Sequence, residues 1–339
     1  MNGLYFTEEY SWDHALPAYL QDVLFDSDTF GARYCQLREE AKSNLYSDSD
    51  KIRCYLGTYF PRSFCESSNL HTLLLGLEPI RGEWLHKTEL NVLDFGSGTG
   101  GNLCGLLHAL SALGIKASLR VFSIEGNEEA LSRQAGILEF VRKNSGIEVE
   151  QHRIHRIFPN DPNSFALEFG EVMAELPEKF DLIMAWKSLS ELFIADQTSA
   201  NGSYGHFLEA CAPRLSSHGV ISMLDVTIKS RGRWLPKVMT QELSRFMRQH
   251  DDMDLIMPFG CAQKQGPCSL AGCFPKFEFP VVHSQCANDK TKFSYFALGG
   301  SSLASSIRDI LPDAMPCPDE CGRNGAPHPG LPLRFTVMR

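Results

Sequence analysis

The segment from Val92 to Asn102 constrains the fold of this chain more than any other part of the sequence. It reads VLDFGSGTGGN, so that a short apolar run, predicted to be a strand, is followed directly by glycines and then by a predicted helix. Glycines at such a turn let the backbone bend sharply and let a ligand approach without a Cβ in the way. The segment therefore predicts a ligand site at the end of a strand in an α/β sheet.

From Leu90 onward, predicted strands and helices alternate along the chain. The run FDLIMA at 180–185 contains a single charged residue, as expected for a strand that is covered on both faces. Alternation of this kind predicts a parallel, doubly wound sheet. The expected strands are 91–95, 118–124, 147–152, 180–185, 219–224, 254–257 and 292–298, and the expected helices are 102–113, 128–144, 204–215 and 235–250.

The chain of 339 residues has room for one large α/β domain with additions. We expect residues 1–88 to form an N-terminal helical region, with helices at 16–24 and 34–45 and a break or a new start at Pro61. Residues 89–300 are expected to form the Rossmann-like domain, including a cysteine-rich loop at 259–290. Residues 301–339 are predicted to be an irregular tail, rich in Pro, Gly and Cys from Pro312 onward.

Two acidic residues lie at the ends of the first two predicted strands, and the first of them argues against a dinucleotide. Asp94 stands just before the glycines, where a pyrophosphate would need a neutral or cationic surrounding. A carboxylate at that point suits the cationic amino-acid part of S-adenosylmethionine better. Glu125 ends the next strand, where a carboxylate can accept hydrogen bonds from both hydroxyls of a ribose.

Residues Leu93 to Gly101 resemble motif I of the class I S-adenosylmethionine-dependent methyltransferases, whose pattern is acidic-x-Gly-x-Gly-x-Gly. The resemblance covers about residues 90–224, and it implies a Rossmann-like sheet, a transferase activity and S-adenosylmethionine as cofactor. The alternatives are an NAD-type Rossmann domain and a fold that has lost its ligand. The expected cofactor-binding residues are Asp94, Gly96, Ser97, Gly98, Gly100, Asn102 and Glu125.

The segment AWKSLSEL at 185–192 follows the fourth predicted strand, at the sheet edge where open α/β sheets bind ligands. Methyl transfer requires an aligned acceptor and, where the acceptor carries a proton, a base. Trp186 can stack on a planar acceptor, and Lys187, Ser188 and Glu191 can orient or deprotonate one. The segment differs from the Asn-Pro-Pro-Tyr signature of the amino-methylating DNA and protein enzymes. The alternative is a helix that packs in the core and leaves Glu191 solvated.

The stretch YLGTYFPR at 55–62 is a candidate lid over the cofactor. Helices added at the N-terminus often cover the cofactor in methyltransferases that act on small molecules. The aromatic residues of this stretch, together with Arg62, would suit an aromatic or anionic acceptor. The alternative is that the aromatic residues pack on the sheet.

Eleven cysteines are present, and six of them crowd into the last quarter of the chain. In a reducing compartment, cysteines are free thiols, metal ligands or catalytic groups rather than disulfides. Four thiolates in one loop can bind zinc or an iron–sulfur cluster, whereas the absence of a tight C-x-x-C pair favours free thiols. The candidate metal ligands are Cys261, Cys268, Cys273 and Cys286, with Cys317, Cys321 and His283 as further candidates.

The order of landmarks also resembles the methyltransferase-like family associated with assembly of the mitochondrial ribosomal small subunit. These landmarks are YL at 55–56 with Pro61, the glycine motif, LIMA at 182–185 leading to LSEL, PC at 267–268 with Cys273, and KFSYFAL at 292–298. The resemblance implies a cysteine-bound metal centre and action on or near ribosomal RNA. The sequence departs from the family at LDVT, 224–227, where the family has a Glu-x-Gly-Thr turn.

The charge balance is acidic, with 32 Lys and Arg against 41 Asp and Glu and a net charge of −9. Proteins that bind nucleic acid usually show a basic excess or patch, so the balance disfavours RNA as a partner. A local basic patch remains an option, and its alternative is a solvated loop and helix face. The candidate patch consists of Lys229, Arg231, Arg233 and Lys237.

The sequence contains no apolar run long enough for a transmembrane helix, and its first residues lack the pattern of a secretory signal. We therefore expect a cytoplasmic protein without a membrane partner. The function that the residues favour is S-adenosylmethionine-dependent methyl transfer to a small-molecule acceptor. The alternative is a ribosome-associated, rRNA methyltransferase-like assembly factor with a cysteine-bound metal centre.

Overall fold

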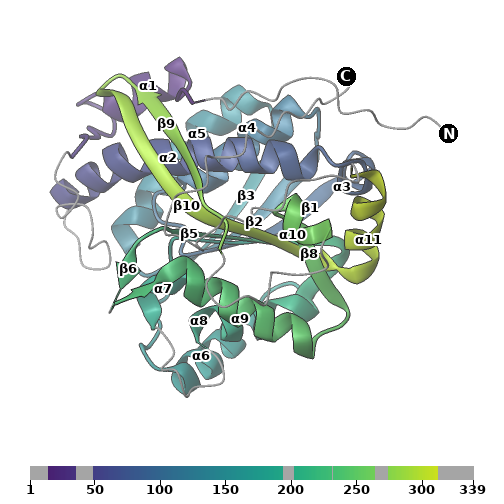
Figure 1. Cartoon of the computed structure of the whole chain (residues 1–339). Coiled ribbons are helices and arrows are strands. Elements are labelled where there is room, and N and C mark those ends of the chain that lie inside the picture. The colour runs from purple at the N-terminus through teal and green to yellow at the C-terminus, as the bar shows by residue number, and fades with distance from the viewer. Residues whose placement is uncertain (1–13, 36–48, 194–201, 231, 264–273, 312–339) are drawn as a thin grey trace.

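The computed structural model describes residues 14–35, 49–193, 202–230, 232–263 and 274–311 (Figure 1). Its centre is an eight-stranded sheet with the order β3-β2-β1-β4-β5-β10-β8, in which β9 pairs with β10. The first five strands of this order run parallel, whereas β10 is antiparallel to β5, β8 and β9. The strands are β1 Glu89–Phe95, β2 Ser118–Glu125, β3 Val149–His155, β4 Phe180–Trp186, β5 Leu215–Val226, β8 Met253–Met257, β9 Phe277–His283 and β10 Cys286–Gly300.

Helices cover both faces of this sheet (Figure 1). One face packs against α1 Ala18–Phe25, α2 Ser49–Leu75, α3 Glu78–Trp84, α4 Gly101–Ala112, α5 Glu128–Ser145 and α11 Ser301–Ile310. The other face packs against α6 Pro162–Ala174, α7 Leu189–Leu192, α8 Ser203–Cys211 and α9 Leu235–Gln249. The short helix α10 Phe259–Gln263 follows β8, and a small hairpin of β6 Lys229–Ser230 and β7 Arg233–Trp234 follows β5.

The local sequence explains where the elements begin and end. All residues of β4 are buried, as its apolar run predicts for a strand between two helical layers. The side chain of Asn127 caps α5 by accepting a hydrogen bond from the Ala130 amide, and Gly146 ends the helix in the left-handed conformation. The α/β class, the mostly parallel Rossmann-like sheet and the N-terminal helices are thus confirmed.

The expected break at Pro61 is wrong, because α2 continues through this residue. A proline inside a helix removes one backbone hydrogen bond, so the helix needs support from packing. Here α2 lies close against α4: a Cβ added at Gly105 would be 2.4 Å from the carbonyl oxygen of Phe64. Phe60, Phe64 and Leu74 of α2 are buried in the same core. Tertiary packing therefore outweighs the local signal of the proline.

Two expectations for the C-terminal part also need correction. Residues 301–310 form α11 rather than an irregular tail, because Leu303, Ala304 and Ile307 give this segment one buried helical face. Much of the expected loop at 259–290 is regular, since it contains α10, β9 and the beginning of β10. The segments 264–273 and 312–339, as well as most of the helix expected at 34–45, lie outside the described residues.

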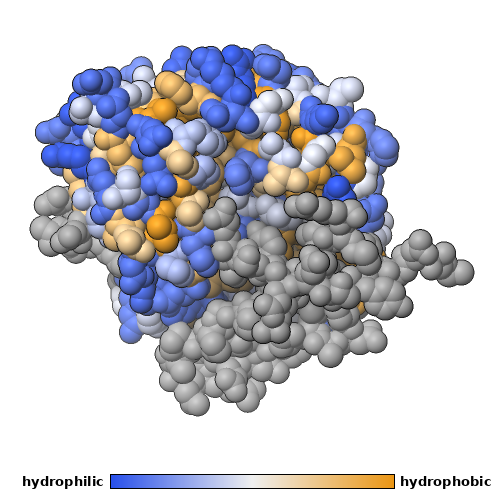
Figure 2. All heavy atoms as spheres, turned by 90° about the horizontal axis from the view of Figure 1, so that it is seen from above, coloured by the Kyte–Doolittle hydropathy of each residue, from blue (hydrophilic) through white to orange (hydrophobic). Residues whose placement is uncertain are grey.

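On the surface that Figure 2 shows, hydrophobic side chains are interspersed with hydrophilic ones. None of the described helices combines the length and the hydrophobicity needed to cross a membrane. Single exposed apolar side chains such as Leu85 and Leu167 are ordinary for a protein surface.

Candidate functional site

The glycine segment forms a tight loop between β1 and α4. Gly96, Gly98 and Gly100 have φ angles of 64°, 53° and 83°, in the left-handed region that side chains disfavour. The amides of Gly96 and Ser97 donate hydrogen bonds to the carbonyl oxygen of Ile124, at 2.8 and 3.1 Å. The loop is therefore tied to the end of β2, where the predicted ribose-binding acid lies.

Two other parts of the chain approach this loop closely. A Cβ added at Gly96 would lie 2.1 Å from Cβ of Ser188, which follows β4. A Cβ added at Gly98 would lie 3.1 Å from the hydroxyl oxygen of Tyr55, on α2. The loop thus lies below α2 and beside the end of β4, at the carboxyl edge of the parallel strands, where such sheets bind ligands.

Asp94 is fully buried at the end of β1. Its Oδ1 accepts a hydrogen bond of 2.6 Å from Nδ2 of Asn102, the second residue of α4. Among the described residues, no hydrogen-bond donor meets its other oxygen, Oδ2. Burial raises the pKa of Asp94 to about 7; the Asn102 amide opposes this shift and the charge of Glu125 adds to it. The site therefore holds a buried carboxylate oxygen that lacks a donor or a cation.

The stability of the ligand-free protein should report this buried acid. Because the folded state raises the pKa of Asp94 from 3.8 to about 7, the folded state binds a proton that the unfolded state has released between these pH values. Stability is then lost as pH rises from about 4 to 7, by at most about 1.4 kcal/mol per pH unit. We expect Asp94→Asn to remove this loss, so that the variant gains stability relative to the wild type as pH rises in urea unfolding. Parallel pH profiles for the two proteins would contradict the assignment.

Glu125 connects the end of β2 to the glycine loop. Its Oε2 accepts a hydrogen bond of 2.8 Å from the Gly98 amide, and its Oε1 accepts one of 2.9 Å from the Asn127 amide. Burial raises the pKa of Glu125, whereas the backbone donors hold it down. The predicted ribose-binding acid is therefore fixed directly beside the central glycine, and its two oxygens together keep acceptor capacity for a hydroxyl donor.

The structure does not place Trp186 as an open stacking surface. Its side chain is 4% exposed and stacks on the His71 ring, with centroids 5.3 Å apart. Its Nε1 donates to Oγ of Ser222, and its ring meets Tyr295 edge to face. Burial of β4 on both faces explains this position, so the predicted role of Trp186 in acceptor stacking is corrected to a role in the core.

Lys187 directly follows β4 and has a φ of 58°, the single positive value among the described non-glycine residues. Its ammonium lies 2.5 Å from Oε2 of Glu66 and 3.4 Å from Oγ of Ser63, both on α2. Glu66 is completely buried, and its Oε1 accepts a hydrogen bond from the Thr291 hydroxyl. Lys187 therefore links β4 to α2 and β10, and its charge is compensated by Glu66.

The remaining two predicted catalytic residues lie at the same edge. Ser188 donates through Oγ to the carbonyl oxygen of Phe95 at 3.2 Å, which joins the ends of β4 and β1. Glu191, in α7, is exposed to solvent, and its amide donates to the carbonyl oxygen of Ser188 at 3.0 Å. Desolvation by the surrounding protein raises the pKa of Glu191 to about 8, and the charges of Glu125 and Asp225 contribute. Glu191 is thus an accessible acid among other acids.

Asp225, at the end of β5, was not predicted as a site residue. Its Oδ1 accepts from the Ser190 hydroxyl at 2.9 Å and its Oδ2 from the Tyr204 hydroxyl at 2.7 Å. The side chain is 1% exposed, and burial raises its pKa. A carboxylate directly after an apolar strand was the available signal, and it is the same signal that identified Asp94 and Glu125.

The candidate lid is a continuous part of α2. Tyr55 and Tyr59 are half-buried with ring centroids 5.0 Å apart, and the Tyr55 hydroxyl lies over Gly98. Arg62 points elsewhere: its Nε and NH2 groups both donate to the carboxylate of Asp289 on β10, and both side chains are buried. The role of Arg62 in binding an anionic acceptor is therefore corrected to that of a buried ion pair.

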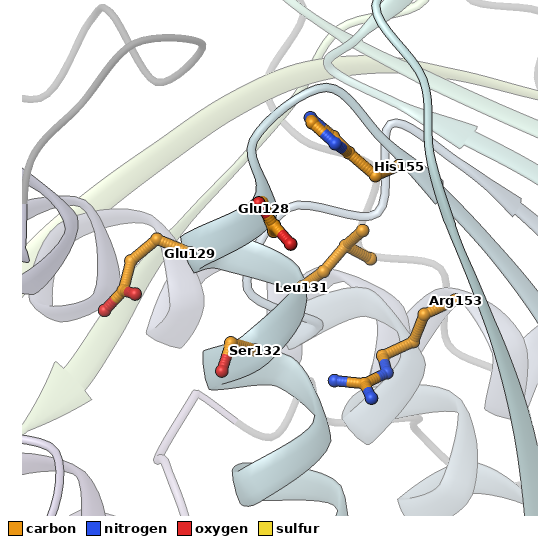
Figure 3. Close-up of a pocket in the computed structure, with 6 residues that line it drawn as sticks. All are labelled: Glu128, Glu129, Leu131, Ser132, Arg153 and His155. Atoms are coloured by element: carbon orange, nitrogen blue, oxygen red, sulfur yellow. The ribbon is translucent and has the colours of Figure 1, made fainter.

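A hollow of about 580 Å³ lies beside Glu125, between β3 and the first turns of α5. Figure 3 shows His155 and Arg153 on β3 facing the helix that carries Glu128 and Leu131. His155 pairs in register with Glu125 and its Nε2 lies 3.0 Å from the carbonyl oxygen of Gly126. The hollow is therefore lined by the strand neighbour of the predicted ribose-binding acid, whereas the Tyr55 hydroxyl lies over the glycine loop itself.

The predicted four-cysteine site does not form around its two described members. Cys286 is the first residue of β10. Cys261 lies in α10, which follows β8, and β8 pairs with the far end of β10, from Ala297 onward. At about 3.3 Å per strand residue, this separation is on the order of 30 Å, far beyond a shared zinc with Zn–S bonds of about 2.3 Å. Cys268 and Cys273 lie outside the described residues, so a metal site formed by them stays a prediction, as it does for Cys317 and Cys321.

In the part of the chain that the structure describes, no three His, Cys, Asp or Glu side chains form a group suited to a metal ion. The candidate basic patch lies on the β6–β7 hairpin and the start of α9. Lys229 packs over the ring of Trp234, and Arg233 donates to the side chain of Gln241, whereas Arg231 lies outside the described residues.

Comparisons with known proteins give distant similarities. No family model matches the chain, and a search of curated proteins finds no match. A protein from Streptococcus mutans described as a SAM-dependent methyltransferase is 9% identical with a TM-score of 0.38, over 65% of this chain and 47% of that one. This chain thus spans about half the length of that protein.

An O-methyltransferase from Bacillus cereus, solved with S-adenosylhomocysteine, is 15% identical with a TM-score of 0.34, over 69% of this chain and 80% of that one. A protein from Clostridium thermocellum described as an rRNA methylase is 11% identical with a TM-score of 0.36, over 67% of this chain and 96% of that one. Identities of this size do not transfer an activity or an acceptor, so the function is inferred from the residues of the site.

Proposed function

We propose that this protein is an S-adenosylmethionine-dependent methyltransferase that acts on a small-molecule acceptor. The observation that carries the proposal is the direct hydrogen bond from the Gly98 amide to Glu125, in a loop of three glycines with positive φ. This bond brings a ribose-binding carboxylate and a backbone without side chains to the same point of the sheet edge.

The buried acid supports a cationic ligand over a dinucleotide. Asp94 has an oxygen that meets no donor among the described residues, directly below the glycine loop. A pyrophosphate at this point would add negative charge beside Asp94 and Glu125, whereas a ligand with an ammonium or sulfonium group would compensate them. The sheet also differs from the dinucleotide-binding order 3-2-1-4-5-6, because the antiparallel β10 lies between β5 and β8.

These residues fit the proposed cofactor in charge. Asp94 would compensate its positive charge, the glycine loop would contact it through backbone, and Glu125 would accept hydrogen bonds from its ribose. When bound, S-adenosylmethionine supplies a methyl group activated by a sulfonium. The protein's contribution is then to hold the acceptor in line with that group and to exclude water.

Binding measured by calorimetry tests this proposal. We expect S-adenosylmethionine and S-adenosylhomocysteine to bind the purified chain with micromolar affinity, in the range of typical enzyme–substrate complexes, and NAD to show no binding in the same assay. In matched titrations, Asp94→Asn should lower the affinity for S-adenosylmethionine more than the affinity for S-adenosylhomocysteine, since only the former carries the sulfonium charge. Binding of NAD in place of S-adenosylmethionine would overturn the proposal.

A further inference from the structure

We propose that the methyl acceptor is a small amine that binds as its ammonium ion, and that Glu191 accepts the proton which the amine releases; this inference rests on the proposed methyltransferase function. The site at issue is the edge of the sheet above the glycine loop. Four elements contribute to it: Tyr55 from α2, Glu125 from β2, Glu191 from α7 and Asp225 from β5.

The hydrogen bonds of the three acids show which one can meet an acceptor. Glu125 uses both oxygens on the Gly98 and Asn127 amides, and it is 9% exposed. Asp225 is 1% exposed and accepts hydrogen bonds from two hydroxyls and from its neighbouring amide. The side chain of Glu191, by contrast, is exposed. Glu191 is therefore the acid of this group that an incoming molecule reaches first.

Asp225 holds the helix of Glu191 in place. The hydroxyl of Ser190, the residue before Glu191, donates to Oδ1 of Asp225 at 2.9 Å. The Tyr204 hydroxyl donates to the other oxygen and fixes the carboxylate from α8. Asp225 is thus a positioning residue, and its charge adds to the negative potential at Glu191.

The aromatic side chains of α2 extend the same preference for a cation. Tyr55 and Tyr59 are half-buried neighbours, and the hydroxyl of Tyr55 lies over Gly98, close to the charges of Glu125 and Glu191. The face of an aromatic ring attracts ammonium groups, most strongly where water is partly excluded. An acid beside an aromatic ring is the chemistry that recognises an alkylammonium ion.

Two of the cations described near this edge are already engaged, while Arg153 and His155 line the separate hollow between β3 and α5. The ammonium of Lys187 is paired with Glu66 at 2.5 Å, and the guanidinium of Arg62 is paired with Asp289. A carboxylate or a phosphate entering here would approach Glu125, Glu191 and Asp225 without a compensating charge from these two residues. The site therefore favours an amine over an anionic acceptor or a nucleic acid.

The reaction balances with Glu191 as the base. An ammonium nitrogen has no lone pair to react, so its proton passes to the carboxylate of Glu191. The neutral amine then attacks the methyl carbon of the sulfonium donor: the N–C bond forms, the C–S bond breaks, and its electron pair stays on sulfur. The methylated ammonium ion leaves, and Glu191 returns its proton to solvent.

The surroundings of Glu191 suit this proton transfer. Desolvation raises the pKa of its carboxyl to about 8, with contributions from Glu125 and Asp225. A general base is most effective when its pKa lies near the working pH. Further ionisable groups described at this edge are Tyr55, whose pKa is raised well above its ordinary value, Tyr204 on Asp225, Asp94 below the loop, Tyr59 beside Tyr55, and the paired Lys187 and Glu66.

Three pairs of probes that differ in charge test the inference on the cofactor-free and the cofactor-loaded protein. The amines are tyramine, histamine and putrescine, and the matching anions are 4-hydroxyphenylacetate, imidazole-4-acetate and succinate. We expect at least one amine to bind about tenfold more tightly than its anion in calorimetry. Its affinity should rise from pH 7 to pH 9 as Glu191 ionises. Glu191→Gln should lose both the preference for the amine and the pH dependence, whereas Glu175→Gln, at the exposed position directly after α6, should keep them.

The outcomes separate this inference from the proposed function. If S-adenosylmethionine fails to bind the wild type, the proposed function fails and the inference falls with it. If S-adenosylmethionine binds but no amine exceeds its anion, or if Glu191→Gln keeps the preference with its fold intact by circular dichroism, the inference alone is overturned. Transfer of labelled methyl groups to a short RNA and not to the three amines would also overturn it.

Discussion

Replacing Gly98 with leucine is expected to abolish binding of S-adenosylmethionine, with a loss of affinity of about 100-fold or more. The φ angle of Gly98 is +53°, and its Cα faces the Tyr55 hydroxyl, which would lie 3.1 Å from an added Cβ. A leucine side chain would therefore occupy the space between α2 and the loop, where the ligand has to contact backbone. The left-handed conformation costs a further 1–2 kcal/mol or so for a residue with a Cβ.

Gly114 offers a matched control for this backbone strain. Its φ is +73°, and nothing lies within 4 Å of a Cβ added there. Gly114→Leu should lose a similar amount of stability and keep full binding in calorimetry. Normal binding by Gly98→Leu would mean that the site has been misplaced, and equal loss of binding by both variants would mean that strain alone causes the effect.

The largest loss of stability is expected on breaking the buried pair of Arg62 and Asp289. Two nitrogen atoms of the Arg62 guanidinium donate to this carboxylate, and the two side chains are 8% and 2% exposed. Asp289→Asn leaves the arginine charge buried without a compensating charge, which typically costs about 3–5 kcal/mol. Guanidinium chloride unfolding of the ligand-free protein measures this loss.

The exposed pair of Arg156 and Glu168 provides the comparison. These side chains lie 2.7 Å apart but are 42% and 32% exposed. Glu168→Gln should therefore change the free energy of unfolding by no more than about 1 kcal/mol. Losses of equal size for the buried and the exposed pair would show that the contact between α2 and β10 contributes little to the fold.

The sequence predicted those parts of the site that depend on a few consecutive residues. The glycine loop, Asp94 and Glu125 lie at strand ends that apolar patterning locates, and the structure places them together. The same patterning also located Glu191, because it follows the all-buried strand β4 closely. Local sequence therefore fixes which groups reach the carboxyl edge of the sheet.

Contacts between distant segments were not predictable in the same way. Arg62 and Asp289 are 227 residues apart in the sequence. They form an ion pair because β10 crosses over α2 in the folded chain. Trp186 was predicted to stack on an acceptor because the sequence of β4 does not show that the His71 ring covers its indole. The prediction of a helix break at Pro61 was wrong for a related reason, because the packing of α2 on α4 is a tertiary contact.

Cysteines that are close in the sequence need not be close in the structure. Cys261 and Cys286 are close in the chain, but β10 is a long strand and carries Cys286 away from α10 (Figure 1). The resemblance to the ribosome-associated family implied a metal centre built on such cysteines. The other candidate cysteines lie outside the described residues, so this metal centre stays a prediction.

We propose that S-adenosylmethionine binds between α2 and the glycine loop, against Glu125. A crystal structure of the chain with S-adenosylhomocysteine would locate the ligand. We expect density for the ligand over Gly96–Gly100, with the ribose hydroxyls within hydrogen-bond distance of Glu125 and with Tyr55 displaced from its place over Gly98. Ligand density elsewhere on the molecule, with the Tyr55 hydroxyl still over Gly98, would show that this placement of the cofactor is wrong.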